Sequence, residues 1–221
     1  MNKDYIVKNV ENILKEIPPY VKLVAVIKGR SLDEIELAIK GGVNILGINY
    51  VKDGIKIYDN FKNLTELHFI GHLQTNKINK AIKIFNTIQT LDSINLANEI
   101  NKRLSNKFMS ISFFIEINIA KEKSKFGIDP DEIYEFAESL SYFNNIKIEG
   151  VMTMGPNLYD EEITRYYFRK TREIYENLKK INFKNFDLKY LSMGMSNSYK
   201  IAIEEGSNMI RIGKKIFEKN L

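Results

Sequence analysis

Short apolar runs alternate with longer amphipathic stretches along almost the whole chain. Each run is nearly continuous, which is typical of parallel strands that helices cover on both faces. The stretches between the runs repeat apolar residues with the period of a helix that buries one face. We therefore expect strands over 23–27, 43–48, 67–71, 87–91, 111–119, 146–154, 186–191 and 209–213.

A helix is expected between successive strands, and one more precedes the first strand. This extra N-terminal helix is indicated by the apolar stripe within Ile6–Ile17, and two prolines end it. Ser31 followed by Glu34 has the spacing of a capping box and indicates the start of the next helix. The remaining helices are expected over 50–61, 75–85, a segment that ends at 104, 130–140, 160–181, and a short segment that Ser196 or Asn197 caps and that ends at Gly206.

Eight strands that alternate with helices predict an α/β fold, a (β/α)8 TIM barrel with one extra N-terminal helix. The 221 residues include no linker rich in proline, glycine or serine, so we expect a single domain over 1–221. An open doubly wound sheet is the alternative. The chain has no GxGxxG motif after its first strand, which argues against a dinucleotide-binding sheet.

The composition excludes several classes of function. The formal net charge is +5, but lysines alternate with acidic residues, so we expect no nucleic-acid groove. The absence of cysteine excludes disulfides, thiolate zinc sites and cysteine nucleophiles. No apolar run is long enough for a membrane span, and the N-terminus lacks the pattern of a signal peptide. These features predict a cytoplasmic protein without a membrane partner.

Two histidines, His68 and His72, are the only candidates for imidazole ligands. They follow a predicted strand rather than sharing a helix face, and no nearby acidic residue completes a metal set. We therefore expect no metal site, and we expect His68 to be a core residue with satisfied hydrogen bonds.

Lys28 directly follows the first predicted strand. The carboxyl ends of barrel strands face the ligand, so we expect Lys28 to point toward whatever the protein binds. A solvated lysine beside a strand is the alternative from this stretch alone, because the chain contains 33 Lys and Arg residues.

Two segments that follow the seventh and eighth predicted strands have the composition of a phosphate site. Loops at these positions hold phosphate in many barrels, where glycines let backbone amides approach the anion. A helix cap, a tight turn and a buried arginine are the alternative interpretation. The residues concerned are Ser192, Gly194, Met195, Ser196, Arg211, Gly213 and Lys214.

A closed barrel would bring Lys28 next to these phosphate loops, because its first and eighth strands are neighbours. A phosphorylated aldehyde suits both groups, and pyridoxal 5'-phosphate is such a ligand. Its aldehyde condenses with a neutral lysine amine to form a Schiff base. Arg211 is expected to face the pyridine nitrogen and to leave it unprotonated, because a guanidinium does not release its proton.

Several segments of the chain resemble one family in their order and spacing. They include VAVIK at 24–28, GINYV at 47–51, HFIGHLQTNK at 68–77, GVMTM at 150–154 and the segments 191–196 and 207–217. Together they are similar to the pyridoxal phosphate homeostasis protein family, which is related to the barrel domain of alanine racemase. The resemblance extends over nearly the whole chain.

The resemblance implies a barrel that holds pyridoxal phosphate as a Schiff base on Lys28, with Arg211 at the ring nitrogen and Asn49 near the ring. Phosphate contacts would come from Ser196 and the backbone around Gly213 and Lys214. With the neighbouring residues of the same loops, the full candidate set is Lys28, Asn49, Ser192, Gly194, Met195, Ser196, Arg211, Gly213 and Lys214.

The implied function is that of a carrier or regulator in intracellular vitamin B6 homeostasis, without an established catalytic reaction and so without catalytic residues. Its partners would be the cofactor and pyridoxal phosphate-dependent acceptor enzymes, and we expect a monomer. Two alternatives stay open: an amino-acid racemase that uses the same cofactor, and a phosphate-sugar isomerase that keeps Lys28 as a free amine.

Three positions depart from the family pattern. Ile48 stands where the family usually has glutamate, Lys214 where a small residue is usual, and Ser198 where an acidic residue is common. All three changes make the local charge more positive or remove a negative one. We expect them to alter cofactor affinity and exchange rather than the fold.

Overall fold

Eight parallel strands close into a barrel in the computed structural model, which describes residues 3–105, 111–156 and 160–219. Each strand pairs with the next one along the chain, and the first pairs with the eighth. The strands are β1 (Lys22–Val26), β2 (Ile45–Ile48), β3 (Glu66–Phe69), β4 (Thr87–Leu91), β5 (Ser112–Ile117), β6 (Lys147–Thr153), β7 (Phe186–Ser192) and β8 (Met209–Ile212).

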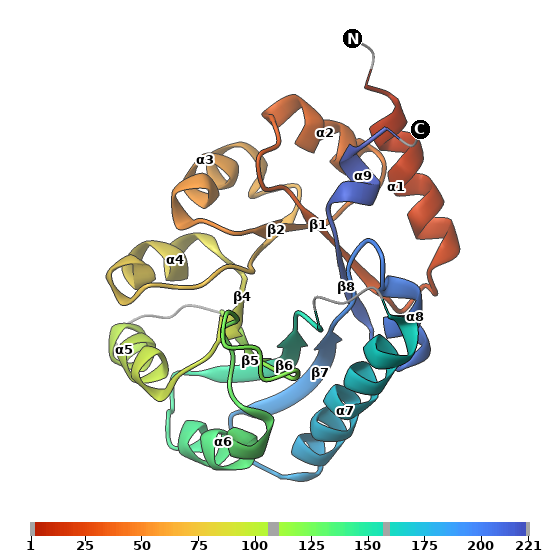
Figure 1. Ribbon diagram of the computed structural model, residues 1–221. Helices are drawn as coiled ribbons and strands as arrows, with labels where there is room; N and C mark the ends of the chain where they lie inside the picture. Colours follow the sequence, from red (N-terminus) through yellow and green to blue (C-terminus); the bar gives the residue numbers. More distant parts are fainter. Residues whose placement is uncertain (1–2, 106–110, 157–159, 220–221) are drawn as a thin grey trace.

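Helices form a ring outside the strands (Figure 1). They are α1 (Tyr5–Glu16), α2 (Leu32–Lys40), α3 (Val51–Phe61), α4 (Ile78–Ile84), α5 (Ile94–Leu104), α6 (Ile133–Ser141), α7 (Glu161–Lys180), α8 (Tyr199–Glu204) and α9 (Lys214–Phe217), with 3-10 turns η1 (Thr75–Lys77) and η2 (Pro130–Glu132). The predicted barrel with an extra N-terminal helix is confirmed. The pairing of β1 with β8 rules out an open sheet.

The side chains of the strands alternate between two cores. Leu23 and Ala25 of β1 belong to the large core between the strands and the helices, whereas Val24 lies inside the barrel. Phe114 and Met152 lie inside the barrel with Val24. This alternation follows from the period of two residues in a strand.

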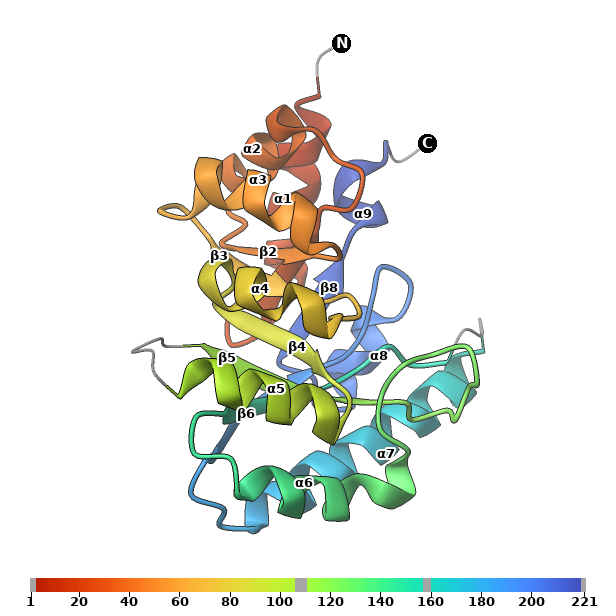
Figure 2. The same ribbon diagram turned by 90° about the vertical axis from the view of Figure 1, so that its left-hand side faces the viewer.

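The two ends of the chain meet on the outside of the barrel, and both termini lie at the same end of the molecule (Figure 2). Asn9 of α1 is buried, and its Nδ2 donates hydrogen bonds to the carbonyl oxygens of Ile216 at 3.1 Å and Glu218 at 3.2 Å. Helix α1 therefore holds α9, which follows the eighth strand directly.

The start of α2 has the expected capping box. Ser31 Oγ accepts a hydrogen bond from the Glu34 amide at 3.3 Å, and Glu34 Oε2 accepts one from the Ser31 amide at 2.9 Å. The box fixes the turn that follows Lys28.

The prediction for the cap of the short helix after β7 is wrong. Helix α8 begins at Tyr199, so Ser198 is its N-cap, and no side chain caps it. The Met195 carbonyl accepts from the amides of Ser198 and Tyr199, and these bonds turn residues 195–198 before the helix begins. The helix also ends at Glu204, two residues before Gly206. Helix α9 was not expected from the sequence.

Candidate functional site

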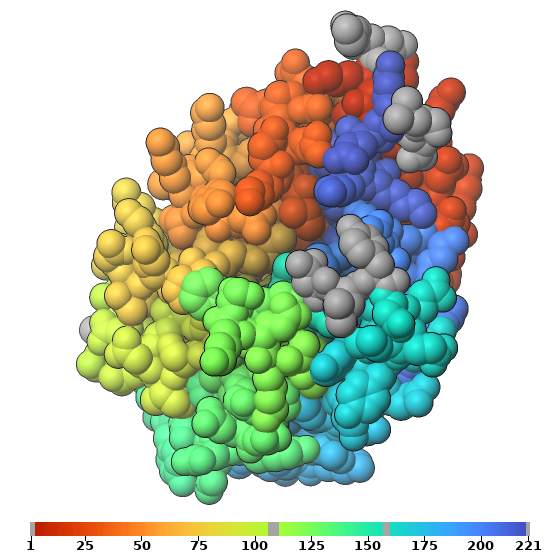
Figure 3. Space-filling model, viewed as in Figure 1, coloured from red at the N-terminus to blue at the C-terminus, as the bar shows by residue number. Residues whose placement is uncertain are grey.

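A cavity of about 420 Å³ lies beyond the carboxyl ends of β1, β6 and β8. Val26, the last residue of β1, lines one wall of the cavity, and Phe168 of α7 lines another. Figure 3 shows the surface of the molecule from the side of Figure 1, with the segment after β5, in green, near the middle. Five of the candidate residues line this cavity, namely Met195, Ser196, Arg211, Gly213 and Lys214.

The side of the cavity where phosphate contacts were expected is built from the loop before α8 and the first turn of α9. Ser196 Oγ accepts a hydrogen bond from the Lys215 amide at 3.4 Å, so this hydroxyl faces the start of α9. Gly213 precedes α9, and a Cβ at this position would stand 3.4 Å from the Val26 carbonyl oxygen and Cβ. The glycine therefore lets the backbone run close to β1. Lys214, the next residue, is exposed.

Arg211 is the cationic centre of the cavity. Its side chain is buried, Nη1 donates to Ser192 Oγ at 2.7 Å, and Nη2 donates to the Thr153 carbonyl oxygen at 2.7 Å. Burial lowers the pKa of Arg211 to about 10, and the nearby Glu116 carboxyl opposes this change. The guanidinium therefore stays charged at neutral pH, and hydrogen bonds on two different nitrogens fix its plane.

Ser192 and Gly194 do not line the cavity. Ser192 is fully buried and accepts from Arg211 behind the cavity wall. The Gly194 carbonyl accepts from the Arg211 amide at 3.0 Å, and its φ of +95° is the left-handed conformation that favours glycine. A Cβ at Gly194 would stand 2.5 Å from Ala202 Cβ, so this glycine also lets α8 pack against the loop.

Lys28 and Asn49 line a second cavity of about 360 Å³ on the other side of the β1 end. Lys28 is exposed, and its Nζ lies 5.7 Å from the centroid of the Tyr50 ring. The side-chain oxygen Asn49 Oδ1 is buried and has no hydrogen-bond partner among the described residues. The structure thus places the lysine and the Gly213–Lys214 loop after the adjacent strands β1 and β8, but in separate cavities.

Sequence reasoning missed Glu116, which lies on β5 inside the barrel. It is only 6% exposed, and its Oε2 has no hydrogen-bond partner within the described part of the chain. Burial, followed by the charge of Asp92, raises the pKa of Glu116 to about 8, although Arg211 opposes the rise. The available signal was a single carboxylate within the apolar run of the fifth strand, at 111–119.

Asp92, whose charge contributes to the raised pKa of Glu116, contacts a histidine at the surface. Its Oδ2 lies 3.2 Å from His72 Nδ1, and burial raises the pKa of Asp92 even though His72 opposes this. The His72 ring in turn stacks on Phe126 with a centroid separation of 3.8 Å. No group of His, Asp and Glu within residues 3–105, 111–156 and 160–219 is placed to hold a metal ion.

The donor set fits a ligand with an anionic group at one end and an electrophile at the other. A hydroxyl, a lysine and backbone amides stand at one side of the cavity, and the buried Arg211 stands at its floor. The primary amine of Lys28 is one strand end away, and Asn49, whose Oδ1 has no partner among the described residues, lines the same cavity as Lys28. Within the ranges that the structure describes, no helix is both long and apolar enough to cross a membrane.

The chain is similar to several known proteins. The profile of the family described as alanine racemase, N-terminal domain, matches residues 1–219. Among similar proteins, the pyridoxal phosphate homeostasis protein of Aquifex aeolicus is 40% identical over 177 residues, which cover 80% of this chain and 77% of the relative. The protein of the same name from Vibrio alginolyticus is 32% identical over 225 residues and 95% of each chain.

Solved structures show the same fold. PipY of Synechococcus elongatus, solved with pyridoxal phosphate bound, is 27% identical with a TM-score of 0.86, and the match covers 96% of this chain and 99% of that one. Alanine racemase from Bacillus anthracis is 19% identical with a TM-score of 0.76, over 98% of this chain and 56% of the racemase. The racemase therefore shares the barrel fold with this chain.

Proposed function

The chain belongs to the alanine racemase N-terminal-domain family and, within it, to the pyridoxal phosphate homeostasis proteins, and from this premise we propose that it binds pyridoxal phosphate as a Schiff base on Lys28. We further propose that it acts as a carrier or regulator of this cofactor rather than as an enzyme. The names of the relatives support this role, because they describe homeostasis and no reaction.

The observation that carries the proposal is the buried guanidinium of Arg211 at the floor of the cavity that Ser196, Gly213 and Lys214 line. A ring nitrogen that accepts a hydrogen bond suits the fixed plane of Arg211. The backbone amides at the start of α9 and the hydroxyl of Ser196 suit a phosphate group. Residues at or just after the ends of the neighbouring strands β7 and β8 thus provide both contacts.

The covalent link requires Lys28 Nζ to leave the Tyr50 ring and approach the barrel axis. Lys28 lies in the turn two residues after the end of β1, next to the strand end that borders the Arg211 cavity. Its exposure leaves the side chain free to turn. The amine forms one C=N bond with the aldehyde carbon and one water is released.

When bound, the cofactor supplies an electrophilic carbon that a primary amine attacks reversibly. The residues of this chain would bind the phosphate, hold Arg211 at the ring nitrogen and present the amine of Lys28. Such reversible attachment is what a carrier needs, because another amine releases the cargo by the same chemistry.

The absorption spectrum with pyridoxal phosphate tests the proposal. The wild type should develop a visible band that borohydride abolishes, and Lys28→Ala should not develop it. Lys52→Ala on the exposed face of α3 is the matched control and should behave as the wild type does. If the protein racemised alanine at a rate that depends on Lys28, it would be an enzyme rather than a carrier. The absence of any band in the wild type would refute the cofactor assignment.

A further inference from the structure

A chain of hydrogen bonds runs through the inside of the barrel from Arg211 to the opposite end. Arg211 Nη1 lies 2.7 Å from Ser192 Oγ, and Ser192 Oγ lies 2.7 Å from Gln89 Oε1. Gln89 Nε2 lies 2.9 Å from His68 Nδ1, and His68 Nε2 lies 3.3 Å from Glu66 Oε2. The five side chains come from four strands, β8, β7, β4 and β3.

The guanidinium fixes the direction of every donor in this chain. Arg211 can only donate, so Ser192 Oγ accepts from it and gives its own hydrogen to Gln89 Oε1. The Gln89 amide then presents its nitrogen to His68, so Nδ1 of His68 accepts. The imidazole hydrogen must therefore be on Nε2, which donates to Glu66. All donors point away from the cofactor cavity.

The three central residues are buried, so solvent does not replace these bonds. Gln89 and Ser192 are 0% exposed and His68 is 2% exposed. Gln89 Nε2 also donates a hydrogen bond to Met209 Sδ at an N···S distance of 3.3 Å, and this bond uses the second hydrogen of the amide. A buried network that is fully satisfied holds its members rigidly, and the loss of one member leaves others unpaired.

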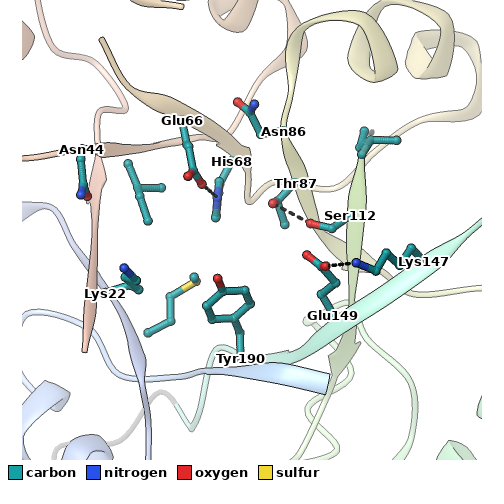
Figure 4. Close-up of a pocket in the computed structure, with 13 residues that line it drawn as sticks. Lys22, Asn44, Glu66, His68, Asn86, Thr87, Ser112, Lys147, Glu149 and Tyr190 are labelled. Atoms are coloured by element: carbon teal, nitrogen blue, oxygen red, sulfur yellow. Dashed lines mark hydrogen bonds and ion pairs between the residues drawn. The ribbon is translucent and has the colours of Figure 1, made fainter. Parts of the chain in front are cut away.

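The far end of the hydrogen-bond chain, at Glu66, lies in a cavity of about 330 Å³ at the amino ends of the strands (Figure 4). Figure 4 shows Glu66 and His68 pointing toward each other there, with Lys22 on the opposite wall. The hydrogen bond from His68 is the largest cause that lowers the pKa of Glu66. The chain thus joins a cation at the ligand end of the barrel to a carboxylate at the other end.

We propose that Gln89, held by His68, is a positioning residue that fixes the Arg211 guanidinium through Ser192 for contact with the cofactor ring. This inference rests on the proposed function. Ser192 Oγ and the Thr153 carbonyl oxygen are the two short contacts of Arg211 in the structure, and Met154 Sδ lies further away at 3.7 Å. Of the two short contacts only Ser192 is a side chain, and among the described residues the acceptor that orients its hydroxyl is Gln89.

Two variants separate positioning from simple support. Gln89→Met keeps the length of the side chain and removes both ends of the link, and Ser192→Ala removes the next member. We expect each to lower pyridoxal phosphate affinity on the order of tenfold, the scale of a buried hydrogen bond to a charged group. Each should also shift the visible band of the bound cofactor in the same direction, because both release the same guanidinium.

The double variant should lose little more affinity than either single variant, because both substitutions cut one link. Gln74→Met is the matched control, since Gln74 is exposed on the loop after β3, and it should leave affinity and band unchanged. The proposal would be overturned if Gln89→Met matched the wild type in cofactor affinity, in the position of the visible band and in the change of that band with pH. A wild type that binds no cofactor would instead refute the proposed function.

A measurement on the cofactor-free protein tests the chain itself. The 15N shifts of His68 should show the hydrogen on Nε2, and the guanidinium N–H groups of Arg211 should exchange slowly with water. In Gln89→Met, the Arg211 exchange should accelerate. A His68 hydrogen on Nδ1, or Arg211 exchange that Gln89→Met leaves unchanged, would contradict the direction and the role assigned to the chain.

Discussion

The buried carboxyl of Glu116 is close enough to Arg211 for their charges to interact, yet its Oε2 has no hydrogen-bond partner among the described residues. Opposite charges in a barrel interior normally pair, because an unpaired buried charge is costly. Burial and Asp92 hold the pKa of Glu116 at about 8, so the carboxyl is mostly neutral at pH 7. The barrel thus contains one charged arginine and one protonated acid near the proposed ligand.

The raised pKa of Glu116 makes stability depend on pH. The folded state keeps this proton up to about pH 8, whereas the unfolded chain releases it near 4.5, so the folded state binds more protons between these values. The free energy of unfolding should therefore decrease as pH rises through this window, by at most about 1.4 kcal/mol per pH unit from this group.

Glu116→Gln tests this account by denaturant titration at pH 5 and pH 8. The variant should resemble the wild type at pH 5, where both side chains are neutral, and be more stable than the wild type at pH 8. Glu36→Gln on the exposed side of α2 is the control for the loss of a surface charge. An equal stability difference at both pH values would show that Glu116 is ionised throughout.

Arg211→Lys should weaken cofactor binding about tenfold or more, although it keeps the positive charge. A lysine ammonium cannot bond Ser192 Oγ and the Thr153 carbonyl oxygen in the fixed plane of a guanidinium. An absorbance titration with pyridoxal phosphate measures the loss. Arg103→Lys on α5 is the matched control, because its partner Glu99 lies on the surface of the same helix, and unchanged affinity in Arg211→Lys would remove Arg211 from the site.

Gly194→Ala should destabilise the protein by about 2 kcal/mol or more and reduce cofactor affinity. The new Cβ would meet Ala202 Cβ at 2.5 Å in a backbone conformation that L residues rarely adopt. Gly29→Ala separates the two causes, because Gly29 also has a positive φ of +75° but, apart from its chain neighbours, no described atom within 4 Å of the added Cβ. It should cost only about 1 kcal/mol, and thermal unfolding of both variants compares them.

Asn9→Ala should loosen α9 and with it the phosphate side of the site. The variant removes a buried hydrogen bond to the Ile216 carbonyl and a partly buried one to the Glu218 carbonyl, which together should cost about 2 kcal/mol. Hydrogen exchange should then accelerate in α9 more than in α3. Asn60→Ala, on the exposed end of α3, is the control, and protection of α9 equal to the wild type would show that α1 does not hold it.

The barrel was predictable because its strands are nearly continuous apolar runs, a pattern that parallel strands under helices require. The boundaries shift by one or two residues, as at β1, which ends at Val26 and leaves Ile27 and Lys28 in the loop. Helix α9 escaped prediction because four residues are too few to show a helical period. The predicted cap of α8 was wrong because a turn that begins at Met195 precedes the helix.

The candidate site was predictable as a set of positions but not as a geometry. The sequence brings Ser196, Arg211 and Gly213 to one cavity through the order of the strands. It does not show that Ser192 turns away from that cavity toward Gln89. The two residues lie on different strands and are far apart in the sequence, so no local pattern indicates that they pair. The rotamer that places Lys28 beside Tyr50 depends on packing, which a sequence pattern does not encode.

The central claim is that Lys28 forms the covalent link to pyridoxal phosphate, and the most direct test is to locate that link. Protein incubated with pyridoxal phosphate should be reduced with borohydride, digested and analysed by mass spectrometry. We expect one dominant phosphopyridoxyl adduct on Lys28, with Lys52, Lys56 and Lys214 largely unmodified. A dominant adduct on Lys214, or an even distribution over surface lysines, would contradict it.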